Sequence, residues 1–136
     1  MRSNQLVLID TNPSDFRLDD RTREIGRKGI VVGDTDREAQ GAAKRAFLQW
    51  YDALIHLWRA HGVGLPRQLI PAEFEDALAQ GYIIAGSAST VRERMKKDNE
   101  IAGINYSLCR LAFGDLSFEE SARSVELFAK EVMPAL

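Results

Sequence analysis

The carboxyl-terminal part of the chain, residues 81–136, limits the possible folds most strongly. It contains two strand-like runs, residues 82–85 and 104–111, and each is followed by a segment with the start pattern and apolar spacing of a helix. This alternation is typical of parallel strands covered by helices, as in α/β barrels and doubly wound sheets. In both architectures the binding site lies at the carboxyl ends of the strands. We therefore expect a site near Gly86 and Ser87, or near residues 113–115.

A strand and a long helix are predicted upstream of this part. Residues 28–32 include adjacent β-branched residues, which favour a short buried strand. Thr35 and Glu38 form a capping-box pattern that opens a helix, and Gly62, Gly64 and Pro66 end it. From residue 36 to residue 61 this helix would be about 39 Å long at about 1.5 Å per residue. Its expected inward stripe is Ala39, Ala42, Ala43, Ala46, Phe47, Trp50, Leu54, Leu57 and Trp58.

Shorter segments complete the prediction. Residues 5–10 form a strand or a packed tail, residues 12–15 a turn, and residues 16–27 a solvated loop. Residues 66–71 resemble a linker, and residues 72–79 a brief helix.

Two more helices follow. Ser87 is the predicted N-cap of a helix from residue 88 to about residue 99. Ser117 and Glu120 form a second capping box, and Pro134 ends the last helix. Its expected inward stripe is Ala122, Val125, Phe128, Ala129 and Val132.

The bulk properties narrow the classes of function. A length of 136 residues fits one domain, residues 1–136, with 45% hydrophobic residues. The net charge of −2 argues against a nucleic-acid or anionic-membrane surface. Single Cys109 excludes an intrachain disulfide and a cysteine cluster for zinc. No apolar run approaches the roughly 20 residues that span a bilayer, and no signal-peptide pattern opens the chain, so we expect a cytoplasmic protein.

Gly86 and Ser87 form the first candidate site. They lie where a strand meets a helix amino terminus, so their N–H groups and the helix dipole could hold a phosphate or another anion. The alternative is that Ser87 only caps the helix and Gly86 frees the turn. Arg110, near the end of the next predicted strand, is a candidate pocket-wall residue that could meet a flavin or a substrate anion. Its alternative, which we favour, is an ion pair with Asp115 or a helix glutamate.

Other reactive or aromatic residues carry plainer interpretations. His56 and His61 are five residues apart, whereas zinc-binding pairs on a helix prefer a separation of four, so no metal is expected. Cys109 lies inside a strand-like run, which favours a buried, inert thiol. The aromatic residues of the long helix could line a flat-ligand pocket, but core packing or a subunit interface is the more common use. They are Phe47, Trp50, Tyr51 and Trp58.

The order of several short patterns resembles the carboxyl end of luciferase-like flavin-dependent monooxygenases. The matching residues are 31–39, Gly86, Ser87, Val91, Ala102, Gly103, Ile104, Ser124, Leu127, Phe128 and 131–136. The resemblance covers residues 28–136 and is strongest over residues 81–136. One departure is Ala88 and Ser89, where the family usually has proline and glutamate.

The resemblance implies a carboxyl-terminal part of a (β/α)8 barrel, because a complete barrel needs about 250 residues. It also implies an oxidoreductase that uses reduced FMN or a deazaflavin and oxygen on a small organic substrate, with a flavin reductase as a possible partner. In the family, most residues that hold the flavin phosphate and the catalytic groups come from strands that would lie upstream of residue 1. They are therefore not carried over, no catalytic residue is predicted, and the isolated chain is expected to be incomplete as an enzyme. The Gly86 and Ser87 turn would lie on the active face.

Two other functions stay open. A partial barrel leaves strand edges unpaired, which favours a non-catalytic, self-associating module and a homo-oligomer. A small α/β protein that binds an anion at Gly86 and Ser87 is the third possibility.

Overall fold

The computed structural model describes residues 25–64, 70–104 and 106–136. In these residues, three parallel strands form one sheet: β1 (Ile25–Val32), β2 (Ile83–Gly86) and β3 (Tyr106–Arg110). The spatial order is β2-β1-β3, so β1 is the central strand. Gly29 marks the overlap of the two pairings, since it lies opposite both Ile83 and Arg110.

Helices fill the connections between the strands. α1 (Asp36–Ala60) and α2 (Phe74–Ala79) lie between β1 and β2, and α3 (Ala88–Ala102) lies between β2 and β3. α4 (Phe118–Leu127) follows β3 and continues as a π-helical turn, Phe128–Val132, and a 3-10 turn, Met133–Ala135. None of the helices in the described segments is both long enough and apolar enough to cross a membrane.

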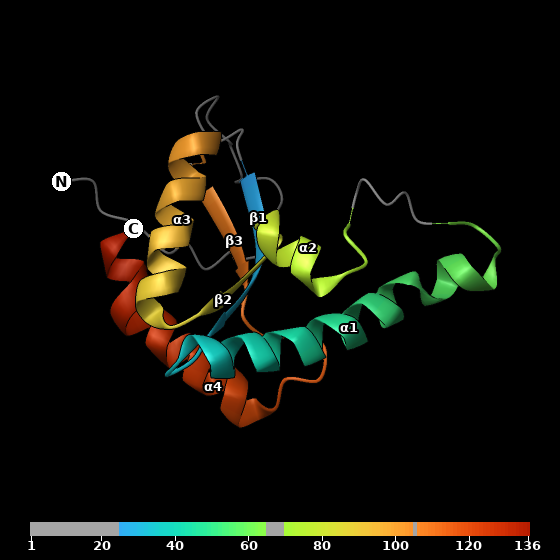
Figure 1. Cartoon of the computed structure of the whole chain (residues 1–136), viewed down its shortest axis with the longest axis horizontal. Coiled ribbons are helices and arrows are strands. Elements are labelled where there is room, and N and C mark those ends of the chain that lie inside the picture. The colour runs from blue at the N-terminus through green and yellow to red at the C-terminus, as the bar shows by residue number, and fades with distance from the viewer. Residues whose placement is uncertain (1–24, 65–69, 105) are drawn as a thin grey trace, which may run out of the picture.

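The sheet has a hydrophobic core on each face, because successive side chains of a strand point to opposite faces. Val31, Ile83 and Ala85 pack against residues of α1 and α2, among them Phe47 and Phe74. On the other face Ile30, Val32 and Ile84 pack against α3 and the α4 segment, through Val91, Met95, Leu127, Phe128 and Val132. Figure 1 shows the sheet between these two sets of helices. The central strand is therefore apolar on both sides.

The predicted α/β class is confirmed: the described residues form parallel strands covered by helices. The strand order differs from that of a closed (β/α)8 barrel, in which successive strands are neighbours and the helices form an outer ring. Here β2 and β3 lie on opposite sides of β1, and helices cover both faces. The described residues thus establish an α/β sheet and do not by themselves establish a barrel.

Most element boundaries lie close to their predicted positions. The strand predicted for residues 28–32 starts earlier, at Ile25, because β3 pairs with Ile25–Gly29, so the end of the predicted loop 16–27 is strand. Of the two predicted capping boxes, the one of Ser117 and Glu120 has both of its hydrogen bonds. At Thr35 one bond is present, in which the Thr35 side chain accepts from the Glu38 N–H. The interpretations of residues 5–10, 12–15, 16–24 and 66–69 lie outside the described residues.

The long helix α1 packs on the sheet only through its first half. Its stripe is buried from Ala39 to Phe47, and in the part that runs beyond the sheet only Ile55 is buried (Figure 1). Leu57 is 65% exposed and Trp58 is 42% exposed, so the predicted inward stripe is wrong at these two residues. The sheet beneath α1 is too narrow to cover a helix of 25 residues.

The inward face of the last helix also differs from the prediction. Phe128 and Val132 are buried as expected, but Ala122, Val125 and Ala129 are exposed. Leu127 and Ser124 take their place, and the Ser124 hydroxyl accepts a hydrogen bond of 2.9 Å from the Val32 N–H. The buried residues keep the regular helical spacing of three and four, so the predicted stripe lay on a neighbouring face of the helix upstream of Phe128.

Candidate functional site

The carboxyl ends of β1 and β2 lie side by side, as predicted for a site in this class of fold. The Gly33 N–H donates a hydrogen bond of 3.1 Å to the Gly86 carbonyl and closes the two strands together. Beyond them is a pocket of about 210 Å³ at the start of α3, and Ser87 lines it. We name it the edge pocket. Its lining also includes Gly33, Asp34, Ala88, Ser89, Arg92, Leu127 and Glu131.

An internal carboxylate already satisfies part of the predicted anion turn. The Ser87 N–H donates to Asp36 Oδ1 at 2.7 Å. This bond, followed by one from the Thr90 hydroxyl, holds the pKa of Asp36 below its usual value although burial opposes the shift. Ser87 is the N-cap residue of α3, yet its side chain makes no capping bond. The turn therefore attracts an anion, and Asp36 supplies it in the folded chain.

Gly86 is required by the same contact. A Cβ at Gly86 would lie 2.7 Å from Asp36 Oδ1 and 2.8 Å from Thr90 Cγ2. Only a residue without a side chain lets Asp36 reach the start of α3. The predicted turn freedom of Gly86 thus serves a close approach between two helix amino termini.

The second predicted location, residues 113–115, is closed by packing against α1. Phe113 is buried in the core under α1. Asp115 accepts a hydrogen bond of 3.0 Å from Arg45 Nε, so the ion pair predicted between Arg110 and Asp115 is wrong. Arg45, on α1, pairs with Asp115 in place of Arg110. Arg45 also pairs with Glu120 at 2.7 Å.

Arg110 instead lies on aromatic rings. Its guanidinium carbon is 4.2 Å from the centroid of the Trp50 ring and 5.1 Å from that of Phe113. Nε is buried and has no hydrogen-bond partner among the described residues. Burial lowers the pKa of Arg110, and the nearby Tyr82 hydroxyl opposes that shift.

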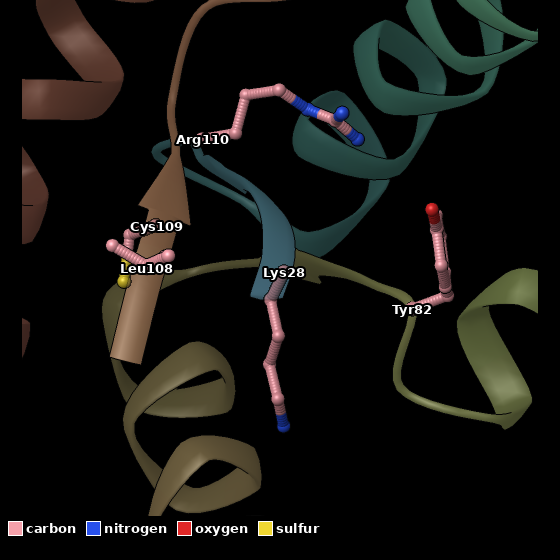
Figure 2. Close-up of a pocket in the computed structure, with 5 residues that line it drawn as sticks. All are labelled: Lys28, Tyr82, Leu108, Cys109 and Arg110. Atoms are coloured by element: carbon pink, nitrogen blue, oxygen red, sulfur yellow. The ribbon is translucent and has the colours of Figure 1, made fainter. Parts of the chain in front are cut away.

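Arg110 lines a second pocket, of about 330 Å³, with Lys28, Tyr82, Leu108 and Cys109. We name it the Arg110 pocket (Figure 2). Arg110 extends across β1 toward the side on which Tyr82 stands, whereas Lys28 points away toward α3. There Lys28 Nζ pairs with Asp98 at 2.5 Å, and Arg94 Nε donates to the same carboxylate at 3.0 Å. The charge of Lys28 is therefore neutralised outside the pocket, and that of Arg110 is not.

The aromatic residues of α1 divide into two groups. Phe47 lies 5.9 Å from Trp50 and 6.0 Å from Tyr51 between ring centroids, and these rings belong to the core under α2. Trp58 lies apart from them on the exposed half of α1. The core-packing interpretation is thus confirmed for the first three residues.

The remaining candidates contribute no reactive group. Cys109 is half-buried, and burial raises the pKa of its thiol although Lys28 opposes the shift. His56 and His61 are both exposed on the outer end of α1. Within residues 25–64, 70–104 and 106–136, no three histidine, cysteine or acidic side chains gather as metal ligands would.

Two residues of the site were missed by the sequence analysis. Asp36 lies in the first turn of α1, and nothing local in the sequence indicates a partner 51 residues away. Asp98, which pairs with Lys28, lies among charged residues of α3 that have the pattern of a solvated helix face. Lys28 lies within a strand that was predicted to be buried. A lysine at such a position indicates that a carboxylate lies close to its ammonium group.

Comparison with known proteins gives a consistent likeness. No family model matches the chain. An uncharacterized protein of Sinorhizobium fredii, y4wF, is 34% identical over 104 residues, which cover 76% of this chain and 30% of that protein.

Two solved structures share the fold. Monooxygenase RslO1 from Streptomyces bottropensis superimposes with a TM-score of 0.65 at 21% identity, over 81% of this chain and 30% of its own. The oxygenating constituent of 3,6-diketocamphane monooxygenase from Pseudomonas putida, a type II Baeyer–Villiger enzyme solved with FMN, gives 0.62 at 25% identity. That alignment covers 87% of this chain and 35% of the enzyme.

The chain therefore spans about a third of the length of the proteins it matches. Within that share its α/β fold is that of monooxygenase structures, one of which holds FMN.

Proposed function

We propose that this chain is the carboxyl-terminal portion of a luciferase-like, flavin-dependent monooxygenase fold. The whole protein would be an oxidoreductase that uses reduced FMN or a deazaflavin and oxygen on a small organic substrate. The observation that carries the proposal is the likeness to the FMN-bound camphane monooxygenase, at 25% identity over 87% of this chain. The order of strand, Gly86, Ser87 and helix, followed by the amphipathic last helix, supports it independently.

The edge pocket is the proposed place for the flavin phosphate. It opens at the carboxyl ends of β1 and β2, where α/β folds bind their ligands. The first turn of α3 directs N–H groups toward it, and Arg92 adds a cation. Because Asp36 engages the Ser87 N–H, the phosphate would bind through the next amides of that turn, at Ala88 and Ser89.

The flavin supplies electrons for the activation of oxygen, and the protein binds and orients it. The described residues would form the phosphate-binding wall of that site, and this wall is the part that a flavin titration of the chain tests. A flavin reductase is the proposed source of reduced flavin.

Binding of FMN to the purified chain tests the proposal. We expect saturable binding followed by flavin fluorescence, weakened in Arg92→Gln because the phosphate loses its cation. Arg59→Gln is the matched control, since Arg59 pairs with Asp52 on the exposed end of α1. Equal affinity for FMN in Arg92→Gln and in the control would show that the flavin phosphate does not bind in the edge pocket.

A second candidate function is that of a non-catalytic, self-associating module. It is favoured by the outer end of α1 and the turn after it, where Leu57, Trp58 and Val63 are exposed. A second copy of the chain is the proposed partner. Light scattering at micromolar concentration tests it: a dimeric mass that Leu57→Ser with Trp58→Ser reduces to a monomer supports it, and a monomeric wild-type mass contradicts it.

A further inference from the structure

The Arg110 guanidinium is the feature that the proposed function leaves unexplained. Its Nε is buried without an acceptor among the described residues. The residue as a whole is half-buried, and a buried polar atom without a hydrogen bond costs free energy. The pocket beside it has about 330 Å³, within the range of small-ligand sites.

The orientation of Arg110 leaves its donors available. Trp50 covers one face of the guanidinium at 4.2 Å, and a stacked guanidinium still presents its N–H groups at its edge. No hydrogen bond or ion pair of the described residues has Arg110 as its donor, although nine such ion pairs join other residues there. Gly29 lies beneath the guanidinium, although a Cβ there would clash with Ile83 Cδ1 at 2.5 Å and only touch Arg110 Nη2 at 3.4 Å.

The residues that line the Arg110 pocket favour a ligand with an anionic group attached to an apolar part. None of the five lining residues is acidic. Lys28 is neutralised by Asp98, so Arg110 supplies the net positive charge. Leu108 and the Tyr82 ring give apolar surface, and Tyr82 stands on the side toward which Arg110 extends (Figure 2). A guanidinium fork matches a carboxylate or phosphate with two parallel hydrogen bonds.

We propose that the Arg110 pocket is a binding site for the oxyanion of a small organic ligand. The oxyanion is either the carboxylate of a substrate or the phosphate of the flavin, and the second source would replace the edge pocket as the place of that phosphate. Only the second source depends on the proposed monooxygenase function. The site is separate from the edge pocket, with which it shares no residue.

Tryptophan fluorescence tests this proposal directly. The chain has two tryptophans, and Trp58→Phe leaves Trp50, the ring under Arg110, as the single reporter. In this background benzoate is titrated beside benzamide, its neutral analogue of similar shape. We expect saturable binding of benzoate and at least about tenfold weaker binding of benzamide. Equal binding of the two, or no binding of benzoate, would overturn the proposal.

Variants at Arg110 give the second arm. Arg110→Gln should weaken benzoate binding at least about tenfold, and Arg110→Lys should weaken it less because the charge remains without the fork. Arg59→Gln removes one exposed arginine and should leave binding unchanged. Full benzoate affinity in Arg110→Gln would contradict the assignment. If that variant does not fold, the comparison of benzoate with benzamide still decides.

Competition distinguishes the two sources of the oxyanion. Displacement of benzoate by FMN but not by riboflavin, which lacks the phosphate, identifies the flavin phosphate as the occupant. Retention of benzoate in the presence of saturating FMN identifies a separate carboxylate ligand. Failure of FMN to bind at all would refute the proposed flavin function and leave the benzoate result standing.

Discussion

The carboxylate of Asp36 accepts a hydrogen bond of 2.7 Å from the Ser87 N–H, and so joins the first turns of α1 and α3. These turns follow β1 and β2, whose carboxyl ends pair at Val32 and Gly86. The bond therefore fixes the geometry of the edge at which the flavin phosphate is proposed to bind.

Asp36→Ala should lower the free energy of unfolding by about 0.5–1 kcal/mol, the lower range for a helix cap because the carboxylate is exposed. Asp36→Asn keeps an acceptor oxygen and should lose less. Urea unfolding of the three proteins measures both values. Identical midpoints for all three would show that the bond contributes nothing to stability.

The same carboxylate predicts a dependence of stability on pH. The Ser87 N–H, and then Thr90, hold the folded-state pKa of Asp36 below the ordinary value of 3.8. Its contribution is thus fully present above pH 3.8 and is lost as the pH falls through the lower folded-state value. Unfolding of the wild type and of Asp36→Asn at several pH values should show a difference that shrinks on acidification. A difference that stays constant down to pH 2 would contradict the account.

Asp98→Ala should destabilise the fold strongly. The Lys28 side chain is 9% exposed and that of Asp98 19% exposed, so the variant leaves a buried ammonium without its carboxylate. We expect a loss of about 2–4 kcal/mol. Glu126→Ala, which removes an exposed carboxylate paired with Arg123 and Lys130, should destabilise the fold far less than Asp98→Ala. Adding Lys28→Met to Asp98→Ala should restore part of the loss, and thermal unfolding measures all four proteins.

Gly114→Ala should destabilise more than Gly103→Ala. Both glycines have a positive φ, 59° and 63°, so each substitution carries a backbone strain of about 1–3 kcal/mol. A Cβ at Gly114 would also lie 2.0 Å from the Ala46 carbonyl oxygen, whereas one at Gly103 meets nothing within 4 Å. The difference between the two unfolding free energies measures this clash. Equal losses would show that α1 does not lie against this loop.

Phe128→Ala should cost about 3–5 kcal/mol, because Phe128 is 8% exposed in the core between α3 and the sheet. Val125→Ala, at a position 46% exposed on the same helix, should cost little. Denaturant unfolding compares them. An equal effect at the two positions would mean that the buried face of this helix is misplaced.

Local patterns predicted the elements well because their causes are local. The capping box of Ser117 and Glu120 and the ends of α1 depend on residues within a turn of one another. The strand order depends on which edge of β1 pairs with β3. The residues of β3 do not specify that edge by themselves. The same holds for the partners of Arg110 and Asp36, which come from α1 and from the start of α3. The exposed end of α1 has the apolar spacing of a buried stripe, so the sequence pattern did not reveal where the sheet ends.

The most direct test of the central claim is a calorimetric titration of the full chain with FMN, oxidised and then reduced, beside a deazaflavin. The proposed monooxygenase fold predicts saturable binding of at least one of these flavins with a micromolar or tighter dissociation constant. Absence of binding by all of them would contradict it, and would leave the self-associating module as the function to pursue.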